Sequence, residues 1–183
     1  MHWQRLEIAE MTGFTSKSAR LFALTLLMAI AGWPAGFQAR AASVLTEAGQ
    51  LPGWRVMPTR FTFPELSMRL EAAIAANGMN LVNSASASDG AKAQGITIPG
   101  NRVVGVFRND FARRMLSVSL AAGIEAPIRF YVTESPDGTA CLSYRIPTSV
   151  FAPYMTDGGD ALRAVAAELD AIFNAIARHA VGP

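Results

Sequence analysis

The sequence predicts an α+β domain whose helices pack on one face of an antiparallel sheet, with elements in the order β-α-β-β-α-β-β-α. Two segments near the middle of the chain, Ile128–Glu134 and Thr139–Ile146, alternate apolar and polar residues around a tight turn, which is typical of a β-hairpin. Apolar residues at helical spacing occur both before and after this hairpin. No internal repeat is visible, so we expect one domain of this class.

The first half of the domain is predicted to form a strand, a helix and a second strand. Trp54–Thr59 is the expected first strand. Thr62–Glu65 has a capping-box pattern with a proline in the first turn, and the pair Asn77-Gly78 is a typical helix end. Met79–Asn83 starts the second strand. The next segment, Ser84–Gly95, is small and polar throughout, which predicts a flexible surface loop.

The second half adds a strand pair, a short helix, the hairpin and a long C-terminal helix. Ile96–Ile98 and Arg102–Phe107 are expected strands joined by the Pro99-Gly100 turn. Asn109 is a suitable N-cap for a short helix. Apolar residues from Leu162 to Ile176 form one stripe of a C-terminal helix.

The hairpin loop Pro136-Asp137-Gly138 predicts the pairing register. A three-residue loop of this type has a type I turn followed by glycine in the left-handed conformation. One face of the hairpin then holds apolar pairs: Val132 with Leu142, Phe130 with Tyr144, and Ile128 with Ile146. The other face holds polar pairs: Thr133 with Cys141, Tyr131 with Ser143, and Arg129 with Arg145. A slip of one residue would mix the two sets, so this register is well specified.

The polar face of the hairpin is the candidate site, because it places Cys141 outside the helix-packed core. Its ligand-binding candidates are Arg129, Tyr131, Cys141, Ser143 and Arg145. Facing arginines repel and need an anionic partner. Three interpretations stay open: a solvated face whose arginines pair with a carboxylate such as Glu134, a subunit interface, or an anion site built from guanidinium groups and hydroxyls.

The N-terminus has the features of an export signal. Lys17 and Arg20 precede the uncharged apolar run Leu21–Ala35, and Ala39-Arg40-Ala41 follows with small residues at the positions that a signal peptidase reads. The run is short for a membrane span, although an uncleaved anchor is the alternative interpretation. We predict cleavage after Ala41, and hence a periplasmic or secreted protein.

The predicted organisation is a signal peptide over residues 1–41, a lead-in over 42–53 and one domain over 54–181. Translation could start at Met1 or at Met11, because a long stretch that contains Glu7 and Glu10 is unusual before a signal. Removing residues 1–41 takes away four of 16 basic and two of 14 acidic residues, which leaves 12 of each. A nucleic-acid binder needs a basic excess, and the mature chain has none.

The residue content of the mature chain also argues against several chemistries. Cys141 is its only cysteine and His179 its only histidine. An internal disulfide is therefore impossible, and a zinc site of the usual cysteine and histidine ligands cannot form within one chain. No local carboxylate pair suggests acid–base catalysis. We therefore predict no catalytic residues, no metal and no cofactor.

These segments together resemble a known family, the domain-of-unknown-function family 302. The resemblance is carried by Ala126–Val132, the Asp137-Gly138 turn and Tyr144–Pro147. Phe107-Arg108-Asn109 also fits, although Asp110 stands where the family often has proline. The first helix fits as well, with Leu70 and Ile74 before Asn77-Gly78. The resemblance extends over roughly Trp54 to Ala180. It implies a TATA-binding-protein-like α+β fold with a single copy of the unit, often as a dimer, and no known catalytic residues.

The leading functional hypothesis is a non-enzymatic periplasmic binding or accessory protein that acts as a homodimer. Its expected partners are a second copy, a small anionic ligand or a periplasmic protein. We expect no nucleic-acid partner and, after signal cleavage, no stable insertion into a membrane. The alternative is an enzyme or redox factor centred on Cys141, supported by Arg129, Arg145 and Tyr131. A third hypothesis is a passive component of an envelope complex.

Overall fold

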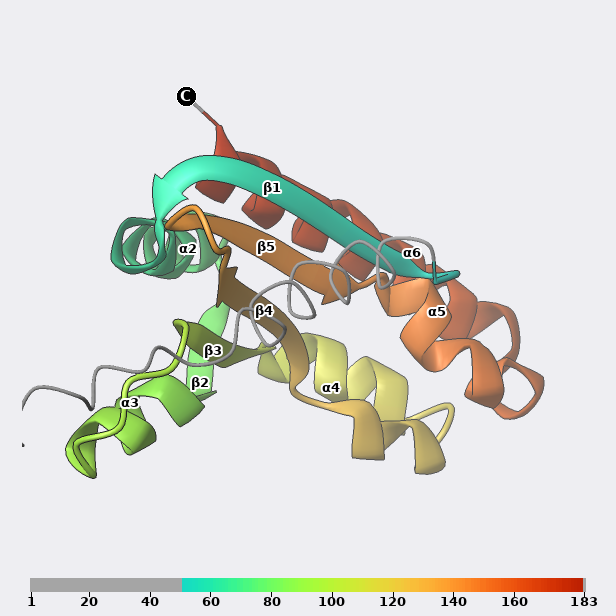
Figure 1. Cartoon of the computed structure of the whole chain (residues 1–183). Helices are drawn as coiled ribbons and strands as arrows, with labels where there is room; N and C mark the ends of the chain where they lie inside the picture. The colour runs from blue at the N-terminus through green and yellow to red at the C-terminus, as the bar shows by residue number, and fades with distance from the viewer. Residues whose placement is uncertain (1–50, 183) are drawn as a thin grey trace, which may run out of the picture. The chain divides into compact units, whose positions relative to one another are not determined.

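Five antiparallel strands form one sheet, and their order is β1-β5-β4-β3-β2 (Figure 1). The computed structural model describes residues 51–182, so the predicted export signal lies outside the described residues. The strands are β1 Trp54–Thr62, β2 Asn80–Ala85, β3 Asn101–Phe107, β4 Ile128–Glu134 and β5 Thr139–Arg145. The fold is thus the predicted α+β class, with every strand pair antiparallel.

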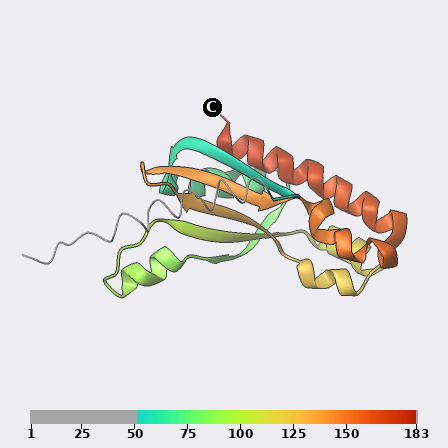
Figure 2. The same cartoon turned by 45° about the vertical axis from the view of Figure 1, so that its right-hand side comes forward.

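Three helices supply the layer that covers one face of this sheet (Figure 2). They are α2 Phe63–Ala76, α4 Asn109–Leu116 and the long α6 Met155–Val181. Shorter helical segments connect them: α3 Ala87–Ala93, η1 Ala121–Glu125, α5 Pro147–Phe151 and η2 Ala152–Tyr154. Helix α6 packs along both α2 and α5, so the chain's last element closes the layer.

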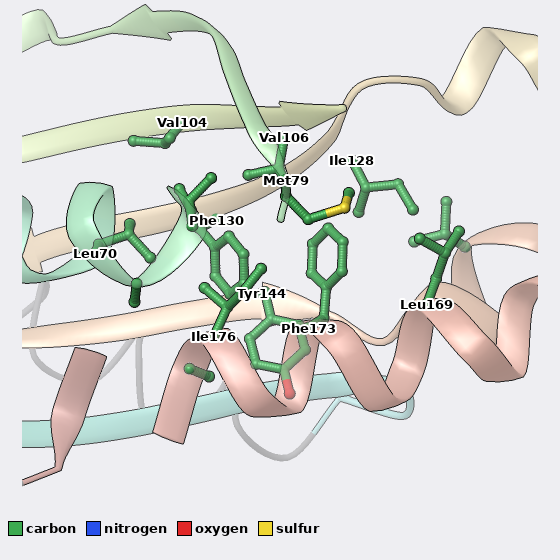
Figure 3. Close-up of a cluster of buried hydrophobic side chains, with 14 of the residues drawn as sticks. Leu70, Met79, Val104, Val106, Ile128, Phe130, Tyr144, Leu169, Phe173 and Ile176 are labelled. Atoms are coloured by element: carbon green, nitrogen blue, oxygen red, sulfur yellow. The ribbon is translucent and has the colours of Figure 1, made fainter. Parts of the chain in front are cut away.

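The hydrophobic core lies between this helix layer and the sheet (Figure 3). Phe130 of β4 is its centre: the ring stacks on Phe173 of α6 with centroids 4.8 Å apart and tilts against Tyr144 of β5 at 5.0 Å. Val132 and Leu142 are fully buried beside it. Because these residues are alternate positions of β4 and β5, one face of the hairpin carries the core.

The predicted hairpin register is confirmed. Phe130 lies opposite Tyr144, and Thr133 lies opposite Cys141. Gly138 has a φ of 81°, the left-handed conformation that the residue after a type I turn requires. The turn closes through a hydrogen bond from the Gly138 N–H to the Ser135 carbonyl at 2.9 Å. The local turn chemistry therefore determines which side chains face the helices.

Helix α2 begins and ends close to the predicted residues. Thr62 is its N-cap residue, but the threonine side chain makes no capping hydrogen bond, so the capping box itself does not form. Asn77 is the C-cap, and Gly78 follows with a φ of 67°. Strand β1 continues to Thr62, beyond the predicted end at Thr59, because a register shift after Pro58 lets it run on along β5.

Several predicted boundaries are wrong. Residues 84–95 are not a loop, because β2 extends to Ala85 and α3 follows, capped by the Ser86 hydroxyl, which accepts from the Asp89 N–H at 3.0 Å. Ile96–Ile98 is not a strand but part of the connection to β3. Asn109 is the first helical residue of α4 rather than its cap, since Arg108 has the extended backbone of the N-cap.

Two side-chain contacts hold the helix layer together at its ends. The Asp170 carboxylate of α6 accepts hydrogen bonds from the N–H and the hydroxyl of Thr148, both at 2.8 Å, and so caps α5. At the C-terminal end of α6, the Arg69 guanidinium of α2 donates to the Ala180 carbonyl at 2.8 Å and lies 4.1 Å from the Phe61 ring centroid. The end of α6 is therefore attached to both α2 and β1.

Candidate functional site

The candidate site lies on the sheet face opposite the core, as the hairpin alternation predicts. Tyr131 and Ser143 are register partners there, and Cys141 pairs with Thr133 one step along the strands. Strand β1 adds a third row, because Trp54 lies opposite Arg145. Cys141 is absent from the hydrophobic core cluster. The structure thus places all five predicted site residues on β4 and β5, on one face.

A hollow of about 280 Å³ opens at one end of this face. Four of the five predicted site residues line it: Arg129, Tyr131, Ser143 and Arg145. Cys141 does not. The hollow also has walls from outside the hairpin, including Trp54 of β1, Val103 of β3, Glu125 of η1 and Val150 of α5. Its size and its mixed aromatic, aliphatic and charged lining suit a small ligand.

The two arginines of the hollow form no ion pair with any carboxylate of residues 51–182. Arg145 makes one long hydrogen bond of 3.4 Å, from Nη2 to the Ser149 carbonyl. Glu134 pairs with neither arginine, because its Oε2 accepts from the Gly100 N–H at 2.7 Å. Within residues 51–182, the arginines therefore pair neither with Glu134, which was the expected example, nor with another carboxylate.

The other polar groups of the hollow are partly engaged. The Ser143 hydroxyl donates to the Tyr131 carbonyl at 3.4 Å. Burial raises the pKa of the Tyr131 phenol, so this group stays a neutral donor at ordinary pH. Glu125 accepts from the Tyr154 hydroxyl at 2.9 Å, and that hydrogen bond raises the pKa of Tyr154. Glu125 therefore adds one carboxylate to a rim that holds two guanidinium groups.

Cys141 is a buried thiol next to the hollow rather than part of it. Burial raises its pKa, with an opposing contribution from the Met57 backbone N–H. Its Sγ makes only a weak contact with the Leu142 carbonyl at 3.8 Å. A reactive cysteine needs a lowered pKa and access to solvent, and this one has neither. The neighbouring Thr133 hydroxyl is also buried, without a hydrogen-bond partner in the described chain.

Next to the candidate site, Gly105 of β3 permits a close contact between its backbone and neighbouring side chains. The backbone of Gly105 lies under the Asn83 side chain of β2, so a Cβ there would overlap the Asn83 carboxamide oxygen. Pro127, before β4, covers the same glycine. Any larger residue at position 105 would displace these two side chains, which supports a requirement for glycine at this point of the sheet.

Sequence reasoning missed Trp54, Glu125 and Val150 as site residues. Their contribution depends on pairing between β1 and β5 and on the packing of η1 and α5, all distant in sequence. The hairpin pattern reveals its own register but not which strand lies beside it. A signal existed only for Trp54, an aromatic residue at the start of a predicted strand.

Other features of residues 51–182 offer fewer sites. These residues contain no cluster of three or more histidine, cysteine, aspartate or glutamate side chains suited to a metal ion. A second, partly open cavity of about 30 Å³ lies at the edge of the core, beside Met79, Phe111 and Met115, and has room for about one water molecule. Within the same range, none of the helices has the length and apolar character of a membrane span.

Together, the fold and the hollow define a single α+β unit with one helix-covered and one open sheet face. Residues 56–177 match the family described as domain of unknown function DUF302. The chain belongs to the DUF302 family, as the sequence resemblance predicted.

A solved structure supports the fold. The chain is similar to the uncharacterized conserved protein DUF302 from Bacillus stearothermophilus, with 20% sequence identity and a TM-score of 0.62. The match covers 71% of this chain and 99% of the other. No curated protein matches the chain. At this identity the likeness supports the fold and carries no activity with it.

Proposed function

We propose that this protein is a binding protein that holds a small anionic ligand in the hollow at the end of its open sheet face. One observation carries the proposal: Arg129 and Arg145 both line the hollow, and neither has a carboxylate partner within residues 51–182. Two guanidinium groups that line the same hollow repel each other, and an anion bound between them removes this repulsion. A carboxylate or phosphate accepts paired hydrogen bonds from such groups.

The remaining walls suggest the shape of that ligand. Trp54, Tyr131 and Val103 provide flat or apolar surface, while Ser143 provides a hydroxyl. A ligand with a planar apolar body and one acidic group would cover these side chains and neutralise the arginines. An aromatic carboxylate is the simplest compound of this chemistry, so benzoate is the first probe.

The ligand proposal is tested by thermal unfolding of the protein with benzoate, citrate or inorganic phosphate, and with neutral benzyl alcohol for comparison. Benzoate should raise the melting temperature by several degrees at saturation, because a ligand that binds only the folded state stabilises it by mass action. The variant Arg129→Gln/Arg145→Gln should lose the shift, while Arg163→Gln, which removes an exposed pair with Asp160, should keep it. Equal shifts in all three proteins would refute the arginine site.

The rival function centred on Cys141 is tested by thiol labelling. Because burial raises the pKa of this thiol, we expect slow reaction with a disulfide reagent in the folded protein and fast reaction in urea. Labelling should follow the fraction unfolded as urea increases. Rapid labelling of the folded protein at neutral pH would favour the redox function instead.

We also propose that the protein works outside the cytoplasm. The support is the order of a basic stretch, the apolar run Leu21–Ala35 and the small residues Ala39 and Ala41. Mass spectrometry of the protein from its own cell envelope should find a chain that starts at Ala42. A chain retaining Leu21–Ala35 would indicate an anchor.

Homodimer formation is the third part of the proposal, and the two edges of the sheet suggest where it occurs. The edge strand β1 carries Arg55, Pro58 and Arg60, which are features that protect an edge from pairing. The other edge strand, β2, is exposed along its whole length and contains neither a charge nor a proline. Light scattering should report a dimer, and Val82→Lys should convert it to a monomer. A wild-type monomer at all concentrations would exclude this assembly.

A further inference from the structure

We propose that the segment Leu116–Ile124, which we call the hook, docks the protein onto an anionic lipid surface. The hook comprises the end of α4, a turn and most of η1. Leu120 and Ile124 are 81% and 80% exposed, and Leu116 is 42% exposed. Leu120 and Ile124 are more exposed than any other large hydrophobic side chain of residues 51–182. Neighbouring apolar side chains at such exposure mark an interaction surface.

The hook presents these side chains through fixed local contacts. The Ser119 hydroxyl is buried and accepts from the Ala122 N–H at 3.3 Å, and Ala122 is fully buried beneath it. Leu116 lies over Gly123, where a Cβ would approach its Cδ2 to 2.8 Å. Because the backbone is held in this way, Leu120 and Ile124 point outward rather than folding against the core.

The charges near the hook favour an anionic partner. Among residues 51–182, Arg113 beside Leu116 forms no ion pair, and neither do Arg129 and Arg145 at the strand ends next to η1. Of the flanking carboxylates, Asp110 is paired with Arg108 and Glu168 with Arg114. Glu125 accepts only from the neutral Tyr154 hydroxyl and keeps its negative charge. Glu125 and Asp157, which is exposed at the start of α6, offset two of the three cations, so one positive charge remains in excess.

A lipid surface fits these observations better than a second copy does. Three aliphatic side chains cover far less than the roughly 800 Å² per partner that a stable protein interface buries. Apolar side chains flanked by cations instead match the boundary between anionic headgroups and acyl chains.

The test places an environment-sensitive fluorophore at the hook of the full chain. Leu120→Cys is labelled in a Cys141→Ser background and mixed with vesicles of phosphatidylcholine, with or without phosphatidylglycerol. The matched control is Asp137→Cys in the β4–β5 turn, at the opposite ends of those strands. This design reports on the hook even if the apolar run near the N-terminus binds vesicles by itself.

We expect a blue shift at position 120 with phosphatidylglycerol vesicles, a smaller one without phosphatidylglycerol, and none at position 137. Ile124→Ser and Arg113→Gln should each weaken the response. For Ile124→Ser we expect the apparent affinity for the vesicles to fall by about tenfold. Unchanged emission at position 120 on phosphatidylglycerol vesicles overturns the proposal. So does a blue shift that grows with protein concentration without vesicles, because the occupant is then a second copy. Neither result affects benzoate binding in the hollow.

Discussion

The two faces of the hairpin β4–β5 differ in composition and surroundings, although their residues alternate along the same two strands. On one face Phe130, Val132 and Leu142 are fully buried under helices. On the other, Tyr131 and Arg129 line an open hollow. The helix-covered face holds the apolar area that stabilises the fold. On the open face Cys141 and Ser143 are buried, whereas Arg129 and Arg145 are exposed and available for recognition.

This difference teaches that stability and binding can be changed separately in the same element. Because adjacent residues of a strand face opposite sides of the sheet, a side chain on one face can be replaced while the next residue keeps its surroundings on the other face. Substitutions at even-numbered positions of β4 should act on unfolding. Those at odd-numbered positions near the hollow should act on ligand binding.

The largest expected effect is on the helix-covered face. Phe130→Ala removes the ring that stacks on Phe173 and contacts Tyr144, and it leaves a cavity in a closed core. We expect a loss of about 3–5 kcal/mol in the free energy of unfolding, measured by urea denaturation. A loss under about 1 kcal/mol would show that this face is not the principal core.

A smaller effect concerns the two tyrosines, one on each face. Burial raises the pKa of Tyr144 and also that of Tyr131 above the ordinary value of 10.0. A raised pKa in the folded state means that the stabilising contribution is complete below pH 10 and is lost as the pH rises through the raised value. Unfolding free energy should therefore fall in strong alkali.

Phenylalanine variants separate the two contributions to this alkaline loss. Tyr144→Phe and Tyr131→Phe should each flatten the fall, measured by urea denaturation from pH 8 to 11. Tyr131→Phe should also alter benzoate binding, because Tyr131 lines the hollow. Tyr144 belongs to the core cluster and lines the hollow as well, so its variant is the comparison for an effect from the core side. A wild-type curve that stays flat above pH 10 would contradict the burial argument.

The smallest expected effect is on the open face. Arg129→Gln/Arg145→Gln should change the free energy of unfolding by less than about 0.5 kcal/mol, because both side chains are exposed and unpaired within the described chain. Stability is measured in the absence of ligand, alongside wild type. A large loss here would mean that the open face supports the fold, and the separation of the two faces would fail.

Local chemistry explains what could be predicted from the sequence. The turn at Gly138 determines the hairpin register, and the register determines which residues lie together on the candidate face. Helix α3 was missed because alanine, serine and glycine between Ser86 and Gln94 offer no apolar periodicity. The hydroxyl of Ser86 caps the start of that helix. The sequence of the segment, however, has the small and polar composition of a loop.

The rest of the site depends on contacts between distant segments. Trp54 reaches the hollow because β1 pairs with β5, some ninety positions later in the chain. Glu125 is positioned by its hydrogen bond to Tyr154. No periodicity within either segment contains this information, because it arises only when the helix layer and the sheet pack together.

The attachment of Arg69 to the end of α6 has a consequence for degradation. An exopeptidase that digests from the C-terminus needs a free, extended end, and the carbonyl of Ala180 is held by this guanidinium. The same arginine lies against Phe61, so digestion past residue 180 requires release of a contact that also orders the end of β1. Trimming of the tail should therefore stop at the last turn of α6 for as long as the domain stays folded.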